Sequence, residues 1–263
     1  MSDEESQDAA DPSVPPSIKR MVHCDAIANN YDAAFKDYKL LEYDHQVLLR
    51  WFAKPGRLLD LGCGTGRTLV EFGKRGFEVE GVDLAPRMLE ISRRKLDEAG
   101  LADVKLHEGN LADPPMDRLS PPYAFAVCLG ATLGYVQGHA NRVRAVRQAG
   151  SLLRPGGEYV FHVQNFLYNL PTLHFPFIVT GLLKWLIGRG EIGDQIFWWY
   201  RDLRWVYMHA FRPKEIARLV RDAGLELVEI FCLNKPCDGP LEGKRRRHWR
   251  SHGFIVRCRR PDG

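Results

Sequence analysis

The sequence predicts an α/β fold in which helices flank a doubly wound, mostly parallel sheet. From Arg57 onward, segments of strand character alternate with segments of helix character, as in chains whose parallel strands are joined by helices. The segment 123–131 is apolar along most of its length, which is typical of a strand covered on both faces. A glycine-rich turn links the first of these strands to its helix. The 263 residues suffice for one large domain of this class.

The N-terminal segment is polar and acidic. Residues 1–16 contain five acidic residues and no basic residue, and prolines interrupt the segment. We therefore predict a disordered acidic tail over residues 1–18 and a folded domain over residues 19–263. No apolar segment of a signal peptide is visible, and six cysteines without a CxxC motif are typical of reduced thiols, so we expect a cytoplasmic protein.

The spacing of apolar residues predicts the individual elements. Between residues 24 and 52 they recur at helical spacing, so one or two helices should precede the first strand. Strands are expected at 57–62, 77–83, 104–110, 123–131, 158–165, 225–233 and 253–260. Helices are expected at 68–76, 85–100, 141–153 and 213–224. A long insert at about 165–210 separates the fifth strand from the last helix.

The segment LLDLGCGTGR, residues 58–67, carries the strongest chemical signal. A strand ends at Asp60, and three glycines at alternate positions precede a helix. Glycine allows the backbone to turn sharply and to approach a ligand closely. Because Arg67 follows Gly66, the spacing departs from the dinucleotide fingerprint, whose third glycine lies one residue later. Asp60 could pair with a cationic group of a ligand, and a tight turn with nothing bound is the alternative.

Five motifs follow one another along the chain: LLDLGCGTG, VEGVDLAPRML, LHEGNLADPP, AFAVCLGATLGYV and LLRPGGEYVFHVQN. In order and spacing they resemble the successive motifs of class I S-adenosylmethionine-dependent methyltransferases. The resemblance covers about residues 25–165 and, more loosely, the final helix and the last two strands. It implies a Rossmann-like, seven-stranded sheet of order 3-2-1-4-5-7-6 with an antiparallel last strand. It also implies S-adenosylmethionine as the cofactor and S-adenosylhomocysteine as the product.

The resemblance further implies which residues hold the cofactor. Asp60 and the backbone of 62–66 would hold its amino-acid end, and Asp83 would accept hydrogen bonds from the ribose hydroxyls. Asn110 stands where the family often has an acid that faces the adenine amino group. Its amide oxygen could accept the same hydrogen bond from that amino group. Leu111 would donate its backbone N–H to the adenine. The complete expected set is Tyr31, Asp60, Gly62, Cys63, Gly64, Gly66, Asp83, Leu84, Met88, Asn110, Leu111, Leu129 and Gly130.

Methyl transfer from a sulfonium needs little help from side chains, because the methyl group is already activated and the acceptor must mainly be aligned with it. His162, at the end of the fifth strand, is the candidate general base, and a buried core histidine is the alternative. Gln164 and Asn165 beside it, and His139 at the start of a helix, are further candidates. Tyr31 would either cover the cofactor or pack in the core.

The insert at about 165–210 is predicted to be a helical lid over the acceptor. Its apolar run from Phe175 to Ile187 falls short of the ~20 residues of a membrane-spanning helix, so we expect no integral membrane segment. Four of the six tryptophans lie at 185–205, where they could line a pocket for an apolar or aromatic acceptor. Core packing or a dimer surface is the alternative, and we expect a monomer or a homodimer. The expected acceptor contacts are Asn165, Trp185, Trp198 and Trp199.

Two features of the C-terminal part compete with this interpretation. Cys232, Cys237, His248 and His252 have a spacing close to that of a zinc finger, but Cys232 falls inside a predicted strand, so we expect no metal. The segment KRRRHWR, residues 244–250, is either a solvated loop or a patch that contacts phosphates. We predict methyl transfer to an N or O atom of a small, apolar or aromatic molecule. The alternatives are an RNA methyltransferase and a non-catalytic regulatory protein that binds S-adenosylmethionine.

Overall fold

A seven-stranded sheet forms the centre of the structure, a computed structural model that describes residues 11–169, 190–200, 203–243 and 247–262. Its strands follow the order β3-β2-β1-β4-β5-β9-β8, and all neighbours are parallel except that β9 runs antiparallel to β5 and β8. The strands are β1 Arg57–Leu61, β2 Glu78–Asp83, β3 Lys105–Glu108, β4 Tyr123–Cys128, β5 Leu153–Gln164, β8 Glu226–Cys232 and β9 Gly253–Arg259. The predicted order 3-2-1-4-5-7-6 is confirmed, since β8 and β9 are the sixth and seventh strands of this sheet along the chain.

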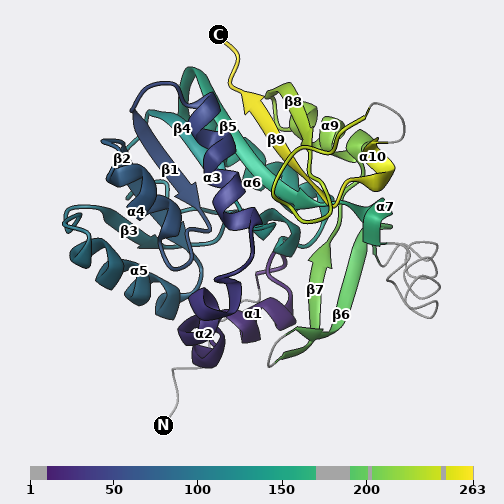
Figure 1. The fold of residues 1–263 in the computed structure, drawn as a ribbon, viewed down its shortest axis with the longest axis horizontal. Helices are drawn as coiled ribbons and strands as arrows, with labels where there is room; N and C mark the ends of the chain where they lie inside the picture. Colours follow the sequence, from purple (N-terminus) through teal and green to yellow (C-terminus); the bar gives the residue numbers. More distant parts are fainter. Residues whose placement is uncertain (1–10, 170–189, 201–202, 244–246, 263) are drawn as a thin grey trace.

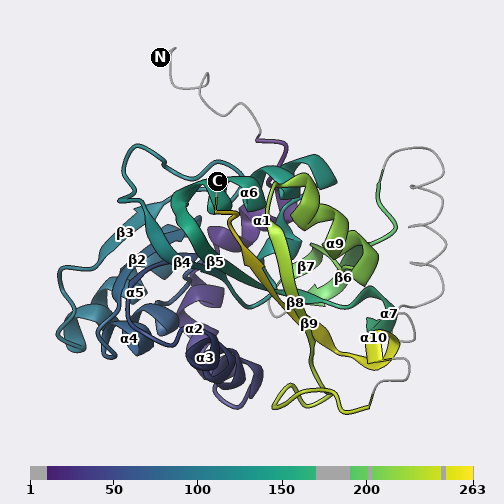
Figure 2. The ribbon, with the colours of Figure 1, turned by 90° about the horizontal axis from the view of Figure 1, so that it is seen from above.

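Helices cover both faces of the sheet (Figure 1 and Figure 2). Successive residues of a strand point to opposite faces, so Leu58 belongs to one core cluster and Leu59 to the other. The first cluster joins the sheet to α3, α4 and α5, and the second joins it to α6 and α9. These helices are α3 Leu40–Trp51, α4 Arg67–Gly73, α5 Pro86–Glu98, α6 His139–Leu152 and α9 Pro213–Asp222.

The N-terminal segment corrects one prediction. Residues 1–10 lie outside the described part of the chain, but residues 11–18 are not a disordered tail. Ser13 and Ile18 are buried, and the helix α1, Pro16–Val22, starts within the predicted tail. Pro16 is the first residue of this helix, where a proline costs nothing because the N–H it lacks would have no partner in the helix. The prolines that indicated disorder therefore mark the start of a helix.

The insert also differs from the prediction. Its described part consists of a short helix, α7 at Phe166–Asn169, and an antiparallel hairpin of β6, Asp194–Tyr200, and β7, Leu203–His209. The prediction of a helical lid is therefore wrong for the hairpin, whose aromatic and β-branched residues favour strands. Residues 170–189, with Trp185, lie outside the described part, and so do the side chains of Trp198 and Trp199.

The described helices include none that is both long enough and apolar enough to cross a membrane. The apolar run 175–187 of the insert falls outside the residues to which this finding applies.

Candidate active site

The loop between β1 and α4 is built on glycines that adopt positive φ angles. Gly62, Gly64 and Gly66 have φ of 86°, 52° and 77°, a region that side chains disfavour. A Cβ at Gly66 would lie 2.2 Å from Ser92 Oγ, and one at Gly62 would lie 2.7 Å from the Thr132 methyl group. A Cβ at Gly64 would meet no atom within 4 Å. The outer glycines thus permit close packing, while Gly64 leaves open space on the ligand side.

Asp83, at the end of β2, is bound to this loop. Its Oδ2 accepts a hydrogen bond from the backbone N–H of Gly64 at 2.7 Å, and its Oδ1 accepts one from Ala85 at 2.8 Å. Burial raises the pKa of Asp83, and the backbone N–H groups oppose that rise. Each carboxylate oxygen retains a lone pair, so the group can still accept hydrogen bonds from a ligand.

Asp60 lies in β1, just ahead of the glycine loop. It is buried, and burial together with the nearby Asp83 raises its pKa to about 7. Asp60 does not line the cavity described below, and neither do Cys63, Gly66 and Leu129. The contact of Asp60 with the cofactor stays a prediction.

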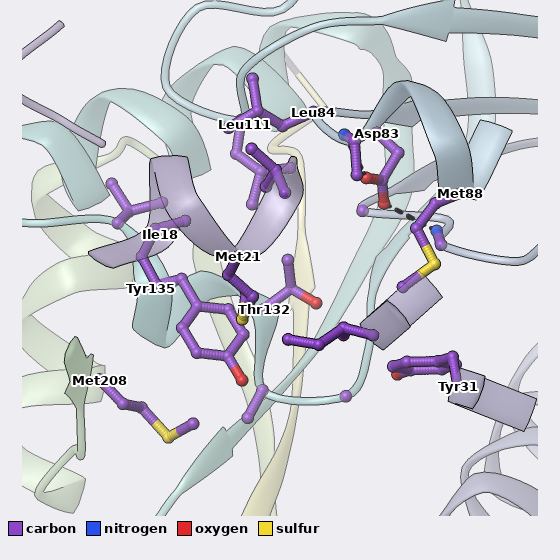
Figure 3. Close-up of a pocket in the computed structure, with 18 of the residues that line it drawn as sticks. Ile18, Met21, Tyr31, Asp83, Leu84, Met88, Leu111, Thr132, Tyr135 and Met208 are labelled. Atoms are coloured by element: carbon purple, nitrogen blue, oxygen red, sulfur yellow. Dashed lines mark hydrogen bonds between the residues drawn. The ribbon is translucent and has the colours of Figure 1, made fainter. Parts of the chain in front are cut away.

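A cavity of about 320 Å³ extends from this loop along the carboxyl ends of the strands. Nine of the thirteen residues expected at the cofactor line it: Tyr31, Gly62, Gly64, Asp83, Leu84, Met88, Asn110, Leu111 and Gly130. Figure 3 shows Asp83, Leu84 and Leu111 toward one end of the cavity and Tyr135 and Met208 toward the other. The cavity therefore combines an end that contains the Asp83 carboxylate with a second, more apolar compartment around Tyr135 and Met208.

Two N-terminal helices form one wall of the cavity. From α1 come Ile18, Met21 and Val22, and from α2, Asp25–Phe35, come Ile27 and Tyr31 among others. The ring of Tyr31 packs against that of Phe35, with centroids 4.6 Å apart. Sequence reasoning missed α1 because three prolines, Pro12, Pro15 and Pro16, lie at or just ahead of its start and its apolar stretch is short.

The cysteines do not line the cavity, and they differ in exposure. All six are free, and Cys24, between α1 and α2, is the one that is partly exposed, while the other five are buried.

The comparisons with known proteins agree with this geometry. The family model of a methyltransferase domain matches residues 35–230. The chain belongs to this family. It is an S-adenosylmethionine-dependent methyltransferase, and S-adenosylmethionine is its cofactor. The residues present fit that cofactor, because the Asp83 carboxylate, the open side of Gly64 and the apolar side chains around Leu84 meet in one cavity.

Two curated relatives show the range of similarity. The methyltransferase is 29% identical over 199 residues to the ubiquinone biosynthesis O-methyltransferase of Burkholderia pseudomallei strain 1710b. The aligned residues cover 74% of this chain and 77% of that protein. It is 32% identical over 87 residues to the magnesium-protoporphyrin O-methyltransferase of Rhodobacter capsulatus. The aligned residues cover 33% of this chain and 37% of that protein.

Solved structures of similar fold include two methyltransferases. The CcbJ methyltransferase from Streptomyces caelestis has a TM-score of 0.61 at 20% identity, over 89% of this chain and 96% of that one. The 1,6-didemethyltoxoflavin-N1-methyltransferase of Burkholderia thailandensis has a TM-score of 0.57 at 16% identity, over 90% of this chain and 85% of that one. These likenesses confirm the fold of the methyltransferase.

His162, near the carboxyl end of β5, lines the cavity. Its side chain is buried, and neither ring nitrogen has a hydrogen-bond partner among the described residues. Burial, with a smaller effect of His252, lowers the pKa of His162 to about 3. The ring is therefore neutral at physiological pH, with one donor and one acceptor nitrogen left for a ligand.

Two other candidates have structural contacts instead. The Asn165 side chain is buried and outside the cavity, and its amide donates to the backbone oxygens of His248 and Ser251 at 2.8 and 2.6 Å. Its oxygen accepts the N–H of Leu167 at 3.0 Å. Asn165 therefore holds the start of the insert, and its contact with the acceptor stays a prediction. His139 also lies outside the cavity and faces Asp222 at 3.5 Å.

The zinc-like spacing does not bring its four residues together. Cys237 Sγ and His252 Nδ1 lie 3.1 Å apart, but Cys232 and His248 do not join them in a group of possible metal ligands within the described chain. Burial raises the pKa of the Cys237 thiol to about 11, which opposes its use as a nucleophile. Of the basic segment, residues 244–246 lie outside the described part, and Arg247–Arg250 form the short helix α10.

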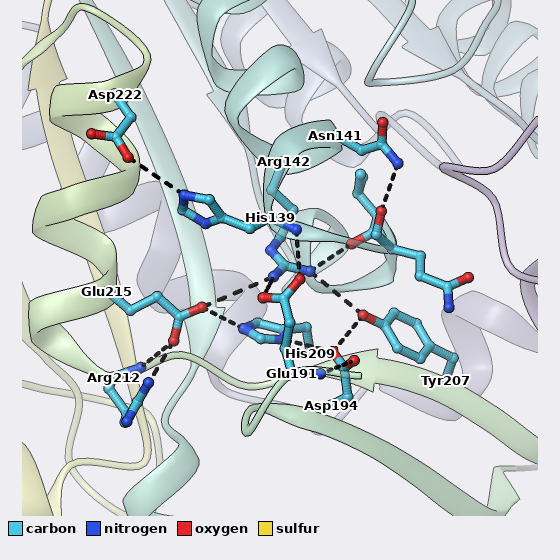
Figure 4. Close-up of polar contacts among 12 residues, drawn as sticks. His139, Asn141, Arg142, Glu191, Asp194, Tyr207, His209, Arg212, Glu215 and Asp222 are labelled. Carbon is cyan, nitrogen blue, oxygen red and sulfur yellow. Dashed lines mark hydrogen bonds and ion pairs between the residues drawn. The ribbon is translucent and has the colours of Figure 1, made fainter. Parts of the chain in front are cut away.

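A buried polar network lies behind the apolar compartment of the cavity (Figure 4). Arg142, on α6, is fully buried and donates to the backbone oxygen of Val136 at 3.0 Å. It also donates to the Glu191 carboxylate at 2.5 Å and to Tyr207 Oη at 3.5 Å. Val136 lines the cavity and Glu191 belongs to the insert, so Arg142 ties the insert to the cavity wall.

His209, on β7, forms the second half of this network. Its Nδ1 lies 2.8 Å from Asp194 and its Nε2 lies 2.6 Å from Glu215, so both nitrogens donate only if the ring is protonated. Atoms of Glu191, His209 and Glu215 lie within 4.8 Å of one another, as in a metal site. The Arg142 guanidinium lies 2.5 Å from Glu191 and 4.0 Å from Glu215, so it already supplies positive charge to these carboxylates.

Proposed function

We propose that this methyltransferase transfers the methyl group of S-adenosylmethionine to an oxygen or nitrogen atom of a small, apolar or aromatic molecule. The observation that carries the proposal is the second compartment of the cavity, which is lined by Ile18, Met21, Tyr135 and Met208 (Figure 3). The buried His162 also lines the cavity. Apolar walls with few polar groups are typical of sites for small molecules.

The cofactor is proposed to lie along the strand ends. Asp83 would accept the ribose hydroxyls, and the adenine would lie beyond them, between Leu84 and Leu111, with Asn110 at its edge. The open side of Gly64 leaves room for the amino-acid portion. This arrangement directs the reactive end toward Thr132 and the second compartment.

When bound, the cofactor supplies a methyl group on a sulfonium that needs only an aligned nucleophile. His162 is proposed to align the acceptor by accepting a hydrogen bond from its O–H or N–H. A ring whose pKa is lowered to about 3 holds a proton poorly, so orientation is favoured over the general-base role. The apolar wall excludes water and favours a neutral acceptor.

The relatives support oxygen as the methylated atom. The ubiquinone biosynthesis and magnesium-protoporphyrin enzymes are named O-methyltransferases, whereas the Burkholderia thailandensis structure is named an N1-methyltransferase. We also retain the cytoplasm as the proposed compartment, supported by the five buried thiols, with a monomer or a homodimer as the proposed assembly.

Methyl transfer from labelled S-adenosylmethionine to a metabolite extract tests the proposal. The expected result is label in an organic-extractable small molecule that is lost with Asp83→Ala. Label in RNA instead would favour the RNA methyltransferase, and label in neither fraction would contradict both.

A further inference from the structure

The N-terminal segment reaches the adenine end of the cavity through Asn110. The amide nitrogen of Asn110 donates to Asp11 Oδ2 at 2.5 Å and to Ser13 Oγ at 2.7 Å. Its amide oxygen accepts the backbone N–H of Ala112 at 3.0 Å. Both amide hydrogens are thus used, and they are used by residues almost a hundred positions away in the sequence.

The segment that makes these contacts is itself held in place. Asp11 Oδ1 accepts hydrogen bonds from the backbone N–H and the hydroxyl of Ser13 at 2.8 and 2.6 Å. The backbone oxygen of Ser13 accepts the N–H of Gln137 at 2.9 Å, and Ser13 is buried. Residues 11–14 therefore form a strap that is fixed to the wall of the cavity, ahead of α1. Val14 and Ser13 line the cavity beside Asn110.

The strap fixes which atom of the Asn110 amide, oxygen or nitrogen, faces the cavity. An amide can rotate by half a turn and present either its oxygen or its nitrogen to a ligand, whereas a carboxylate presents oxygen in either orientation. Two acceptors on one side of Asn110 and one donor on the other permit a single orientation. Since its hydrogens are used, Asn110 can offer only an oxygen lone pair to the cavity.

The charge of the strap acts in the same direction. Burial alone would raise the pKa of Asp11, but the hydrogen bonds from Ser13 and Asn110 lower it overall, so Asp11 is ionised at neutral pH. A carboxylate that accepts from the amide nitrogen polarises the amide and strengthens its oxygen as an acceptor.

We propose that Asp11 and Ser13 are positioning residues that fix Asn110 as a hydrogen-bond acceptor and thereby make the cofactor site selective for a purine with an exocyclic amino group. This rests on the adenine placement proposed above. Two segments then determine the selectivity. The loop after β3 supplies the acceptor, the Asn110 oxygen, and the strap fixes the orientation of the Asn110 amide.

The test compares S-adenosylhomocysteine with its 6-deamino analogue, which keeps the ring nitrogens and lacks the amino group. In calorimetric titrations, the wild type should bind S-adenosylhomocysteine about 10- to 100-fold more tightly than the 6-deamino analogue, because the analogue lacks one partner of a buried hydrogen bond. In the double variant Asp11→Ala/Ser13→Ala, this ratio of the two affinities should fall to about 3-fold or less. In Asp11→Ala alone, the ratio should lie between these two values. A purely structural loss would weaken both ligands equally and leave the ratio unchanged.

Rescue and control variants complete the test. Asn110→Asp in the double-alanine background should restore the ratio, because a carboxylate needs no strap to present oxygen. Asp25→Ala, which removes an exposed acid at the start of α2, should leave the ratio at its wild-type value. A wild-type ratio in the double-alanine variant, together with its loss in Asn110→Ala, would overturn the role of the strap. A wild-type ratio in Asn110→Ala would overturn the adenine placement instead.

Discussion

Asp83 Oδ2 accepts a hydrogen bond from the backbone N–H of Gly64 at 2.7 Å, so the end of β2 is joined to the loop that follows β1. The same carboxylate is proposed to hold the ribose, and it therefore links the conformation of the glycine loop to the occupancy of the site. A change of Asp83 should affect both.

Asp83→Ala should abolish the thermal stabilisation of the protein by S-adenosylhomocysteine. Two charge-assisted hydrogen bonds to ribose hydroxyls, each of about 1.5–3 kcal/mol, correspond to at least about a 100-fold loss of affinity. Glu78→Ala is the matched control, because Glu78 is exposed at the other end of β2 and should leave the stabilisation intact. Stabilisation that survives in Asp83→Ala would count against the ribose contact.

His162→Gln should lower kcat by about 100-fold while S-adenosylhomocysteine binds as before, since His162 lines the cavity and is proposed to align the acceptor. The pKa of His162 is lowered to about 3, so the wild-type rate should show no titration of this residue between pH 5 and 8. His139→Gln, outside the cavity, is the control. A rate that titrates near pH 6.5 in the wild type and not in His162→Gln would contradict the neutral ring.

Arg142→Met should lower the free energy of unfolding by about 3–5 kcal/mol, because it leaves the Val136 oxygen and the Glu191 carboxylate without their buried cation. Urea unfolding followed by circular dichroism measures the change. Arg218→Met removes an arginine that is largely exposed on α9 and should leave the midpoint unchanged. Equal midpoints for the two variants would show that the network carries no stability.

The contribution of His209 to stability should decrease as pH rises. Burial alone would lower its pKa, but the hydrogen bonds to Asp194 and Glu215 raise it above the usual 6.5. A raised pKa means that the folded state binds the proton more tightly, so the stabilisation is fully present below pH 6.5 and is lost as pH passes the folded value. The difference in unfolding free energy between wild type and His209→Gln should therefore be larger at pH 6 than at pH 9.

The partner carboxylate offers a check on this pH dependence. In an Asp194→Asn background, one of the two acceptors of His209 loses its charge, so the decrease between pH 6 and pH 9 should become smaller. An unchanged decrease would assign the titration to a different group.

The cofactor loop could be predicted because its signals are local, and the sheet order because the motifs of the chain resemble those of a family with that order. Three glycines beside a strand end, and an acid at the end of the next strand, are close in sequence and fix the loop and Asp83 directly. The same motifs predict that Asp60 contacts the ligand, whereas its buried side chain does not line the cavity.

The features that sequence reasoning missed depend on distant pairs. Asn110 meets Asp11 and Ser13, and Arg142 meets Glu191, 49 positions later, so neither contact leaves a periodic signal. Prolines and acids before residue 18 indicated disorder because composition describes a segment in isolation. The surface that orders this segment is formed by the rest of the chain.

The exposure of the thiols allows a fluorescent label to be attached at one native cysteine. Cys24 is the one partly exposed cysteine, and it lies between α1 and α2, the two helices that wall the cavity. A maleimide fluorophore should therefore attach at a single position in the folded protein, without any engineered substitution. Its emission should change when S-adenosylhomocysteine binds in the cavity that these two helices line, and the change would report binding in real time.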